Sequence, residues 1–298
     1  MKKCIITVYY LIDNFYKIYQ EWERKRLIPS SNQRNRDGKL SLAELLTIAI
    51  YFYLSPCKDF KNYYLYYLCH KYKEYFCLPS YSRIIQLWPR MLLPLVVLMH
   101  YLKGEETRIY YIDSTKLAIC HNKHIFSNRV FNKISKIGKS SYGWFLCFKL
   151  HLIINNKGEI MSVKITKGNK SDLSIASVIS KGLSVKLFGD KAYISKELFH
   201  QLFSNGLRLF TNLRKDMKTY LLHIEDKRLL NKRSLIESVF NVLKKHMHLE
   251  HTRHRSPINF FVHIISSLAS YSISKLLIPI FSSLLFFSLL YLTIFWHY

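Results

Sequence analysis

Acidic residues are scarce in this chain, which has 19 Asp and Glu against 45 Lys and Arg in 298 residues. The formal net charge of +26 predicts a polyanionic partner, either nucleic acid or an anionic membrane surface. Apolar residues make up 49% of the chain, which excludes a largely disordered protein. The length fits one large domain or two domains of ordinary size.

Paired cysteines are also absent from the sequence. The six cysteines are irregularly spaced and none forms a C-x-x-C pair, which excludes a paired-cysteine zinc module and favours a reducing cytosol. Residues 1–12 are too polar for a secretory signal, so we expect none. Charge is absent from residues 276–298, a stretch long enough to span a bilayer.

The order of the predicted elements indicates an α/β fold preceded by a helical region. Residues 1 to about 105 read as helices, and one of them opens with a capping box formed by Ser41 and Glu44. A charged linker at 103–108, KGEETR, marks the expected boundary. After it we expect an antiparallel meander of three strands, followed by alternating helices and strands, which together give a mixed sheet flanked by helices. The expected strands are residues 109–119, 143–155, 159–168, 185–193 and 207–213, and the expected helices are residues 171–180, 195–206 and 232–248.

The few carboxylates that do occur stand at informative positions. Between Asp113 and Asp172 there are eleven Lys or Arg and one acid, and no acid lies between Asp172 and Asp190. Asp113 is expected to end the first strand, Asp190 the apolar part of the fourth, and Glu237 lies in the last helix. Three carboxylates that converge in this way make a hard oxygen site, which predicts two magnesium ions, or manganese, acting on a phosphodiester. Taken singly, either Asp also fits a turn or cap residue.

The last predicted helix has a polar face suited to DNA. Arg233, Glu237, Asn241 and Lys244 share this face, opposite an apolar face of Ile236, Val239, Phe240 and Leu243. The polar face fits a metal ligand flanked by phosphate contacts, and it fits an ordinary exposed surface with an Arg233–Glu237 ion pair as well. Periodicity does not separate these two readings. The predicted DNA contacts are Arg233, Lys244, Asn241 and, on the second strand, Lys149.

Three motifs together, YYIDST, FGDKAYIS and KRSLIESVFNVLKK, resemble the DDE transposases of bacterial insertion sequences, and insertion-sequence family 982 in particular. The likeness runs from about residue 10 to about residue 275. Its strength lies in the order and spacing of the motifs, and in the run R-x-x-x-E-x-x-x-x-x-x-K at Arg233, Glu237 and Lys244. The related signature often has a Tyr three positions before the Arg, where this chain has Leu230.

The resemblance implies a ribonuclease-H-like fold in which Asp113, Asp190 and Glu237 form a catalytic triad that holds two magnesium ions. Asp172 is a rival for the second Asp, but it precedes a helix as a cap would, so Asp190 is preferred. The basic residues that flank the Glu of the triad would touch transposon-end DNA.

An enzyme of this kind cuts double-stranded DNA at the inverted repeats of its own element and joins the freed 3′-hydroxyls to target DNA. The resemblance further implies a homodimer or higher oligomer on DNA, in the bacterial cytoplasm at the nucleoid. Residues 106–275 would form the catalytic domain. By analogy, residues 1–105 would bind the DNA ends.

The uncharged tail at 276–298 has two interpretations. It is either a tail anchor in a membrane or the extension of an element copy whose end was altered. We favour the extension, because a transposase must reach the nucleoid. Two further functions stay open, an inactive DNA-binding relic and a stand-alone nuclease of the same fold that cuts without joining. The presence of all three triad residues argues against a simple loss of chemistry.

Overall fold

The chain forms two compact units in the computed structural model. The structure describes residues 4–26, 38–120, 124–140, 143–213, 217, 222–250 and 254–295, with side chains described as far as residue 277 apart from those at 139 and 140. The first unit, here called the helical unit, comprises Met1–Leu102 and Phe261–Tyr298. The second, here called the sheet unit, comprises Lys103–Phe260. The chain therefore leaves the helical unit after Leu102 and returns to it at Phe261.

The helical unit has no strand among its described residues. Helix α1 spans Ile5–Arg26, and its aromatic residues Phe15 and Tyr19 are buried. Helix α2 spans Leu42–Leu54 and is buried along most of its length. Shorter helical segments follow, namely α3 (Phe60–Asn62), η1 (Tyr63–Leu68), α4 (Cys69–Lys71), α5 (Tyr81–Leu87), η2 (Trp88–Met91) and α6 (Leu92–Tyr101). The predicted helical character of the N-terminal region is confirmed.

Helix α2 begins with the predicted capping box. The backbone N–H of Glu44 donates to Ser41 Oγ at 3.2 Å, and the backbone N–H of Ser41 donates to the Glu44 carboxylate at 2.7 Å. Because the box pairs two N–H groups that the helix leaves unpaired, we expect Ser41→Ala to lower the free energy of unfolding by about 1 kcal/mol. Urea unfolding measures this loss. Ser82→Ala, at an exposed position inside α5, is the control, and an equal loss in both variants would contradict the capping role.

Helix α11 (Pro257–Phe295) is the longest element of the chain. From Phe261 onward this helix belongs to the helical unit. The Tyr53 hydroxyl and His263 Nδ1 are hydrogen-bonded at 2.8 Å, and Ser270 Oγ donates to the backbone carbonyl of Ile50 at 2.8 Å. These bonds join segments more than two hundred positions apart in the sequence, so this helix is an integral part of the unit.

Two described helical segments are long and apolar enough to cross a membrane, Tyr81–Tyr101 and Pro257–Leu277. The second is mostly buried inside the protein, and core helices pass the same test of length and composition. Helix α11 continues through position 276, where the uncharged tail was expected to begin. The side chains of residues 278–298 lie outside the described residues, so the two interpretations of the tail stay open.

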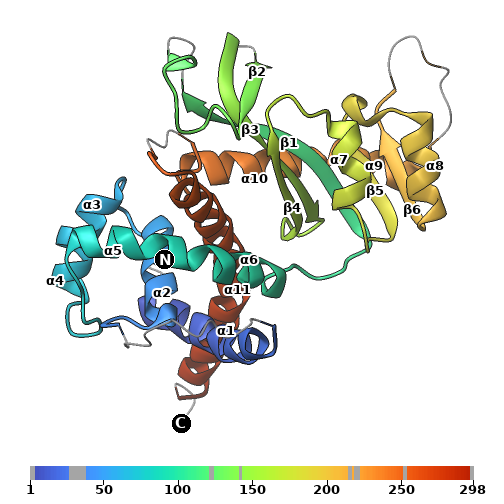
Figure 1. Cartoon of the computed structure of the whole chain (residues 1–298). Coiled ribbons are helices and arrows are strands. Elements are labelled where there is room, and N and C mark those ends of the chain that lie inside the picture. The colour runs from blue at the N-terminus through green and yellow to red at the C-terminus, as the bar shows by residue number, and fades with distance from the viewer. Residues whose placement is uncertain are drawn as a thin grey trace. The chain divides into compact units, whose positions relative to one another are not determined.

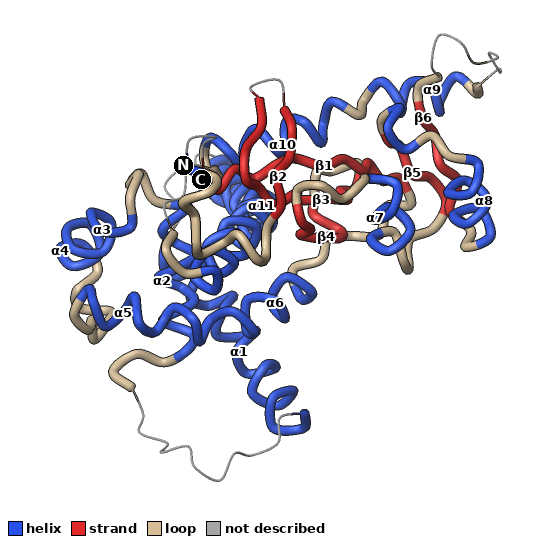
Figure 2. Tube along the Cα trace, turned by 45° about the horizontal axis from the view of Figure 1, so that its top comes forward, coloured by secondary structure: helices blue, strands red, loops and turns tan. Residues whose placement is uncertain are grey.

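The sheet unit is built on one mixed sheet of six strands (Figures 1 and 2). The strands are β1 (Ile109–Cys120), β2 (Lys136–Ser140), β3 (Gly143–Asn155), β4 (Ile160–Lys167), β5 (Val185–Gly189) and β6 (Leu207–Thr211). Strands β1, β3 and β4 form the predicted antiparallel meander, and β5 and β6 follow parallel to β1. The spatial order β4-β3-β1-β5-β6, with β2 beside the first residues of β3, is the ribonuclease-H-like order. The predicted fold class is confirmed.

Helices cover both faces of this sheet. Helices α7 (Asp172–Ile179) and α8 (Lys196–Ser204) pack on one face, here called the α7 face, around a core that includes Tyr110, Ile112, Leu187, Leu198 and Leu202. The other face, here called the α10 face, is covered by α9 (Ile224–Asn231) and α10 (Ser234–Lys245). On it the ring of Phe188 lies 5.7 Å from that of Tyr111 and 5.0 Å from that of Phe210.

The first strand covers almost the expected residues 109–119, but Asp113 does not mark its end. Strand β1 does not end at Asp113 but continues to Cys120, because β3 pairs with it over this whole length and Leu117 is buried. Only the pairing of β1 with the shorter parallel strand β5 ends near Asp113, because its last residue pair is Tyr111 with Phe188. Strand β2 and helix α9 were not predicted. The sequence of α9, IEDKRLLN, has too few apolar residues for a periodic signal.

Candidate active site

Asp113 and Asp190 are brought next to one another by the register of two parallel strands. Tyr111 of β1 pairs with Phe188 of β5, and Asp113 and Asp190 each follow two residues later, just beyond this pairing, where the charge of Asp190 acts on Asp113. Side chains alternate along a strand, and therefore both carboxylates point to the α10 face, as Tyr111 and Phe188 do. Neighbouring strands are roughly 4.8 Å apart. As predicted, Asp190 directly follows the last residue of its strand.

The Asp113 carboxyl is withdrawn from water. Burial raises the pKa of Asp113 to about 6. The backbone N–H of Ser114, which donates at 2.8 Å, and the charge of Arg233 lower this pKa, whereas the charges of Asp190 and Asp172 raise it. Burial and like charges both disfavour the ionised form of a carboxyl group, whereas a nearby cation favours it. The position therefore favours a bound cation.

Glu237 is connected to this site through Arg233. Helix α10 is amphipathic as predicted, and its four apolar residues Ile236, Val239, Phe240 and Leu243 are buried. Arg233 Nη1 lies 3.7 Å from Asp113 Oδ2, and Nη2 donates to Glu237 Oε1 at 3.0 Å. The Glu237 side chain is 57% exposed. Arg233 thus contacts two of the three predicted carboxylates. The ion pair between Arg233 and Glu237, which was the alternative reading of the sequence, is present.

Asp172 belongs to a different cluster, on the α7 face. Lys149 Nζ donates to Asp172 Oδ2 at 2.8 Å, and His151 Nδ1 lies 3.4 Å from Oδ1. His151 pairs with Ser114, the neighbour of Asp113, so the side chains of His151 and Asp113 point to opposite faces of the sheet. Burial raises the pKa of Asp172, but the neighbouring side chains of His151, Lys149 and Ser114 outweigh it and hold this pKa below its usual range.

The cluster of Lys149, His151 and Asp172 was not predicted from the sequence. It joins β3 to the start of α7 across more than twenty positions. The only sequence signal for it is Asp172 itself, which stood out in a stretch poor in acids.

Tyr193 packs behind Asp190 at the end of β5. It lies in the short 3-10 turn Lys191–Tyr193, and its ring is buried in the core of the α7 face. Burial raises the pKa of its hydroxyl far above the ordinary value. Gly189 permits this packing, because a Cβ there would lie 3.0 Å from Tyr193 Cδ2 and 3.1 Å from Ile112 Cγ2. The end of the strand that carries Asp190 is thereby held by close packing.

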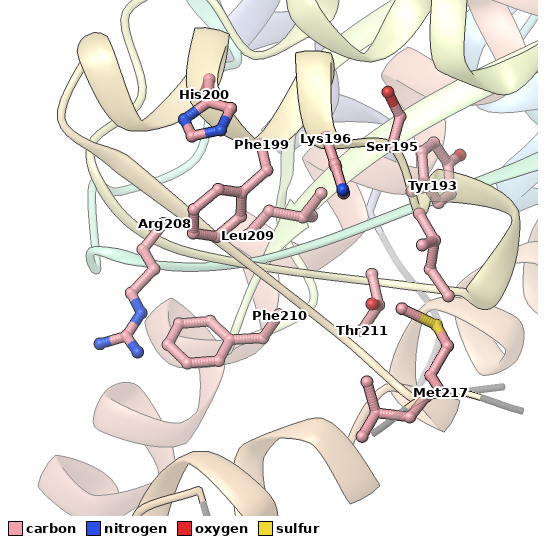
Figure 3. Close-up of a pocket in the computed structure, with 12 residues that line it drawn as sticks. Tyr193, Ser195, Lys196, Phe199, His200, Arg208, Leu209, Phe210, Thr211 and Met217 are labelled. Atoms are coloured by element: carbon pink, nitrogen blue, oxygen red, sulfur yellow. The ribbon is translucent and has the colours of Figure 1, made fainter. Parts of the chain in front are cut away.

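A cavity of about 300 Å³ opens beside Tyr193 (Figure 3). Its lining combines the rings of Phe199 and Phe210 with the basic side chains of Arg208 and Lys196. The Arg208 guanidinium lies 5.0 Å from the centroid of the Phe210 ring. Aromatic rings next to cations suit a nucleobase or a sugar with its phosphate.

The four predicted DNA contacts differ in how freely they could meet a phosphate. Asn241 is exposed on α10. Lys244 Nζ lies 2.5 Å from the Glu250 carboxylate, and the Lys244 side chain is 29% exposed. Lys149 is largely buried and held by its carboxylate partner, while Arg233 is neutralised by two carboxylates. Their roles in binding DNA stay predictions.

The chemistry of the donors fits a hard divalent cation. Asp113 and Asp190 offer carboxylate oxygens, which magnesium and manganese prefer. Among the residues that the structure describes, no group of three or more His, Cys, Asp or Glu lies close enough to hold a metal ion. Glu237 is turned toward Arg233. It would complete such a site only after its side chain left that guanidinium.

The sheet unit matches a known protein family. The sequence profile of the family described as "Transposase DDE domain" matches residues 103–257, which are 155 of the 298 residues. No curated protein matches the chain.

One similar solved structure is the cryo-EM structure of the simian T-cell lymphotropic virus intasome in complex with PP2A regulatory subunit B56 gamma. The sequence identity is 16% and the TM-score is 0.27. The similarity covers 62% of this chain and 61% of that one, so this chain spans less than two thirds of the length of that relative.

Proposed function

We propose, because this chain belongs to the family of transposases with a DDE domain, that it cuts DNA at the inverted-repeat ends of its own insertion sequence and joins the freed 3′-hydroxyls to target DNA. The observation that carries this proposal is the placement of Asp113 and Asp190, in register and on one face of the sheet, within the residues that the family profile matches. The three sequence motifs support insertion-sequence family 982 as the group within this family.

Asp113, Asp190 and Glu237 would hold two magnesium ions, or manganese. When bound, these ions supply positive charge at the scissile phosphate and lower the pKa of the attacking water. Water attacks the phosphorus, and the bond to the departing 3′-oxygen breaks to leave a 3′-hydroxyl. This hydroxyl would then attack a phosphorus of the target DNA in the same site, and the bond from that phosphorus to the target's 3′-oxygen would break, which leaves a 3′-hydroxyl on the target strand. Arg233 contributes a fixed positive charge between Asp113 and Glu237.

The partner proposed is double-stranded DNA, both the ends of the element and the target. The net charge of +26 supports this choice, because cations on the protein release counterions from DNA. A homodimer or higher oligomer is proposed, since two ends must be brought together. The site of action would be the nucleoid of a bacterial cytoplasm, with residues 1–105 binding the ends.

A cleavage and joining assay tests the proposal. The full chain is incubated with a labelled duplex that carries the terminal repeats flanking its own gene, together with an unlabelled plasmid as target. We expect nicks at the repeat and joined products in magnesium, and neither in EDTA, because the carboxylate site needs a divalent cation.

Other outcomes separate the rival functions. Cleavage without joined products would assign the chain to the nucleases. Specific binding without cleavage would make it an inactive relic. Absence of any binding to the repeat would overturn the proposal and favour the tail-anchored membrane protein.

A further inference from the structure

A basic cavity of about 680 Å³ lies in the sheet unit beyond the end of β1. Two segments far apart in the sequence line it. One contributes His124 and Arg129, and the other contributes His254 and Arg255. Both arginines are exposed. Within the described part of the chain neither arginine has a carboxylate at ion-pair distance, in contrast to Lys244.

Aromatic packing holds the two segments together. The buried ring of Phe131, which follows Arg129, lies 5.4 Å from the ring of Phe260 at the start of α11. The Phe148 ring of β3 lies 5.4 Å from Phe260 on another side. Asn128 Oδ1 accepts the backbone N–H of Phe131 at 3.0 Å. The cavity is therefore preformed, since its walls are fixed to the sheet by buried contacts.

The charge of this cavity is unbalanced. Residues 121–140 contain five Lys or Arg and no Asp or Glu. Burial lowers the pKa of His254 to about 4, so this imidazole is neutral near pH 7 and the arginines supply the charge. Two guanidinium groups that line one cavity, with no carboxylate among its described lining residues, make its potential positive, and a bound anion offsets this potential. The planar guanidinium fork matches the oxygens of a phosphate.

We propose that Arg129 and Arg255 bind a backbone phosphate of the DNA on which the protein acts. This proposal rests on the function proposed above and adds a contact remote from the catalytic carboxylates. Strand β1 continues for seven residues from Asp113 to Cys120, which is roughly 23 Å. This length corresponds to about 7 base pairs of B-DNA. A duplex that is cut at Asp113 and runs along β1 would present another of its phosphates near this cavity.

Phe126 gives the same segment an aromatic contact. Its side chain is 92% exposed, the most of any large hydrophobic residue for which the structure gives an exposure. It lies between His124 and Arg129 in the sequence. An exposed aromatic ring in a segment that also contains Arg129 suits packing on a deoxyribose or an unstacked base. Phe126 would thus add affinity without adding a charge.

The salt dependence of DNA binding tests this site. Affinity of the full chain for a labelled random-sequence duplex is measured from low to moderate potassium chloride, for the wild type, Arg129→Gln and Arg255→Gln. Each variant should lower affinity about tenfold at low salt and reduce the slope of log affinity against log salt by about one. Phe126→Ala should lower affinity and leave the slope unchanged.

Arg228→Gln is the matched control. Arg228 is an exposed arginine of the same unit, but it is paired with Glu225 at 2.9 Å. Its removal changes the net charge by the same amount, so a slope equal to the wild-type slope is expected. Arg129→Lys should keep the slope and lose part of the affinity, because an ammonium cannot make the two parallel bonds of a guanidinium.

The possible failures can be told apart. Slopes of Arg129→Gln and Arg255→Gln equal to that of the control would overturn the phosphate site and leave the transposase proposal standing. A wild type that binds no duplex at low salt would overturn both. Titration with inorganic phosphate in the absence of DNA separates the two sources of phosphate, since submillimolar binding lost in Arg129→Gln would assign the cavity to a free anion instead of DNA.

Discussion

Asp190→Ala is expected to lower the rate of DNA cleavage about 1,000-fold, which corresponds to about 4 kcal/mol of activation free energy. The variant removes one of the two carboxylates that the parallel strands hold in register, and with it an oxygen ligand for magnesium. Binding to the terminal repeat should stay within a few-fold of the wild type, because a carboxylate contributes nothing favourable to phosphate contacts. A gel assay of nicked repeat duplex at saturating protein measures the cleavage rate.

Glu225→Ala is a suitable control for this prediction. Glu225 is an exposed carboxylate in α9 of the same unit, so its loss changes the net charge equally but leaves the register of β1 and β5 untouched. We expect unchanged cleavage in this variant. Wild-type cleavage in Asp190→Ala would show that another group completes the site, and would remove the observation on which the proposed function depends.

The fold could be predicted from the sequence wherever a signal was local. The capping box at Ser41, the amphipathic α10 and the turn from β5 into Asp190 each lie within about a dozen residues, and all three are present. The order of strands followed from their succession along the chain, because a three-stranded meander and alternating helices leave few other arrangements. Local patterns thus sufficed for the fold class and for the position of Asp190.

Contacts between distant segments could not be predicted in this way. The cluster of Lys149, His151 and Asp172 joins β3 to the start of α7 across more than twenty positions. The neutralisation of Arg233 by two carboxylates depends on where α10 lies on the sheet. Hydrophobic periodicity contains no information on either. The preference for Asp190 over Asp172 likewise had only a capping argument in the sequence, and the structure adds that the two residues serve different faces of the sheet.

Asp172→Ala is expected to lower the free energy of unfolding by about 3 kcal/mol. The side chains of Asp172 and Lys149 are 18% and 13% exposed, and that of His151 is 1% exposed. Removal of the carboxylate leaves a mostly buried ammonium group on Lys149, which then donates only a long hydrogen bond of 3.5 Å to the backbone carbonyl of Lys170 within the described part of the chain. Urea unfolding followed by circular dichroism measures the change, with Asp226→Ala, at the ion pair between Lys186 and α9, as a second carboxylate to compare.

A double variant distinguishes a structural role of Asp172 from a catalytic one. Lys149→Met combined with Asp172→Leu replaces the ion pair by apolar groups of similar size, and its loss of stability should be smaller than the sum of the single losses by at least about 1 kcal/mol. If the role of the Asp172 carboxylate were to bind a metal ion, its removal would change the stability differently. Its removal would relieve the repulsion that raises the pKa of Asp113, and stability would stay constant or rise. That result, together with wild-type cleavage in Asp190→Ala, would exchange the roles of Asp172 and Asp190 and place the second catalytic aspartate across the sheet from Asp113 and Glu237. The alternation of side chains along β1 argues against such a pair, because Glu237 and Arg233 approach Asp113 from the α10 face.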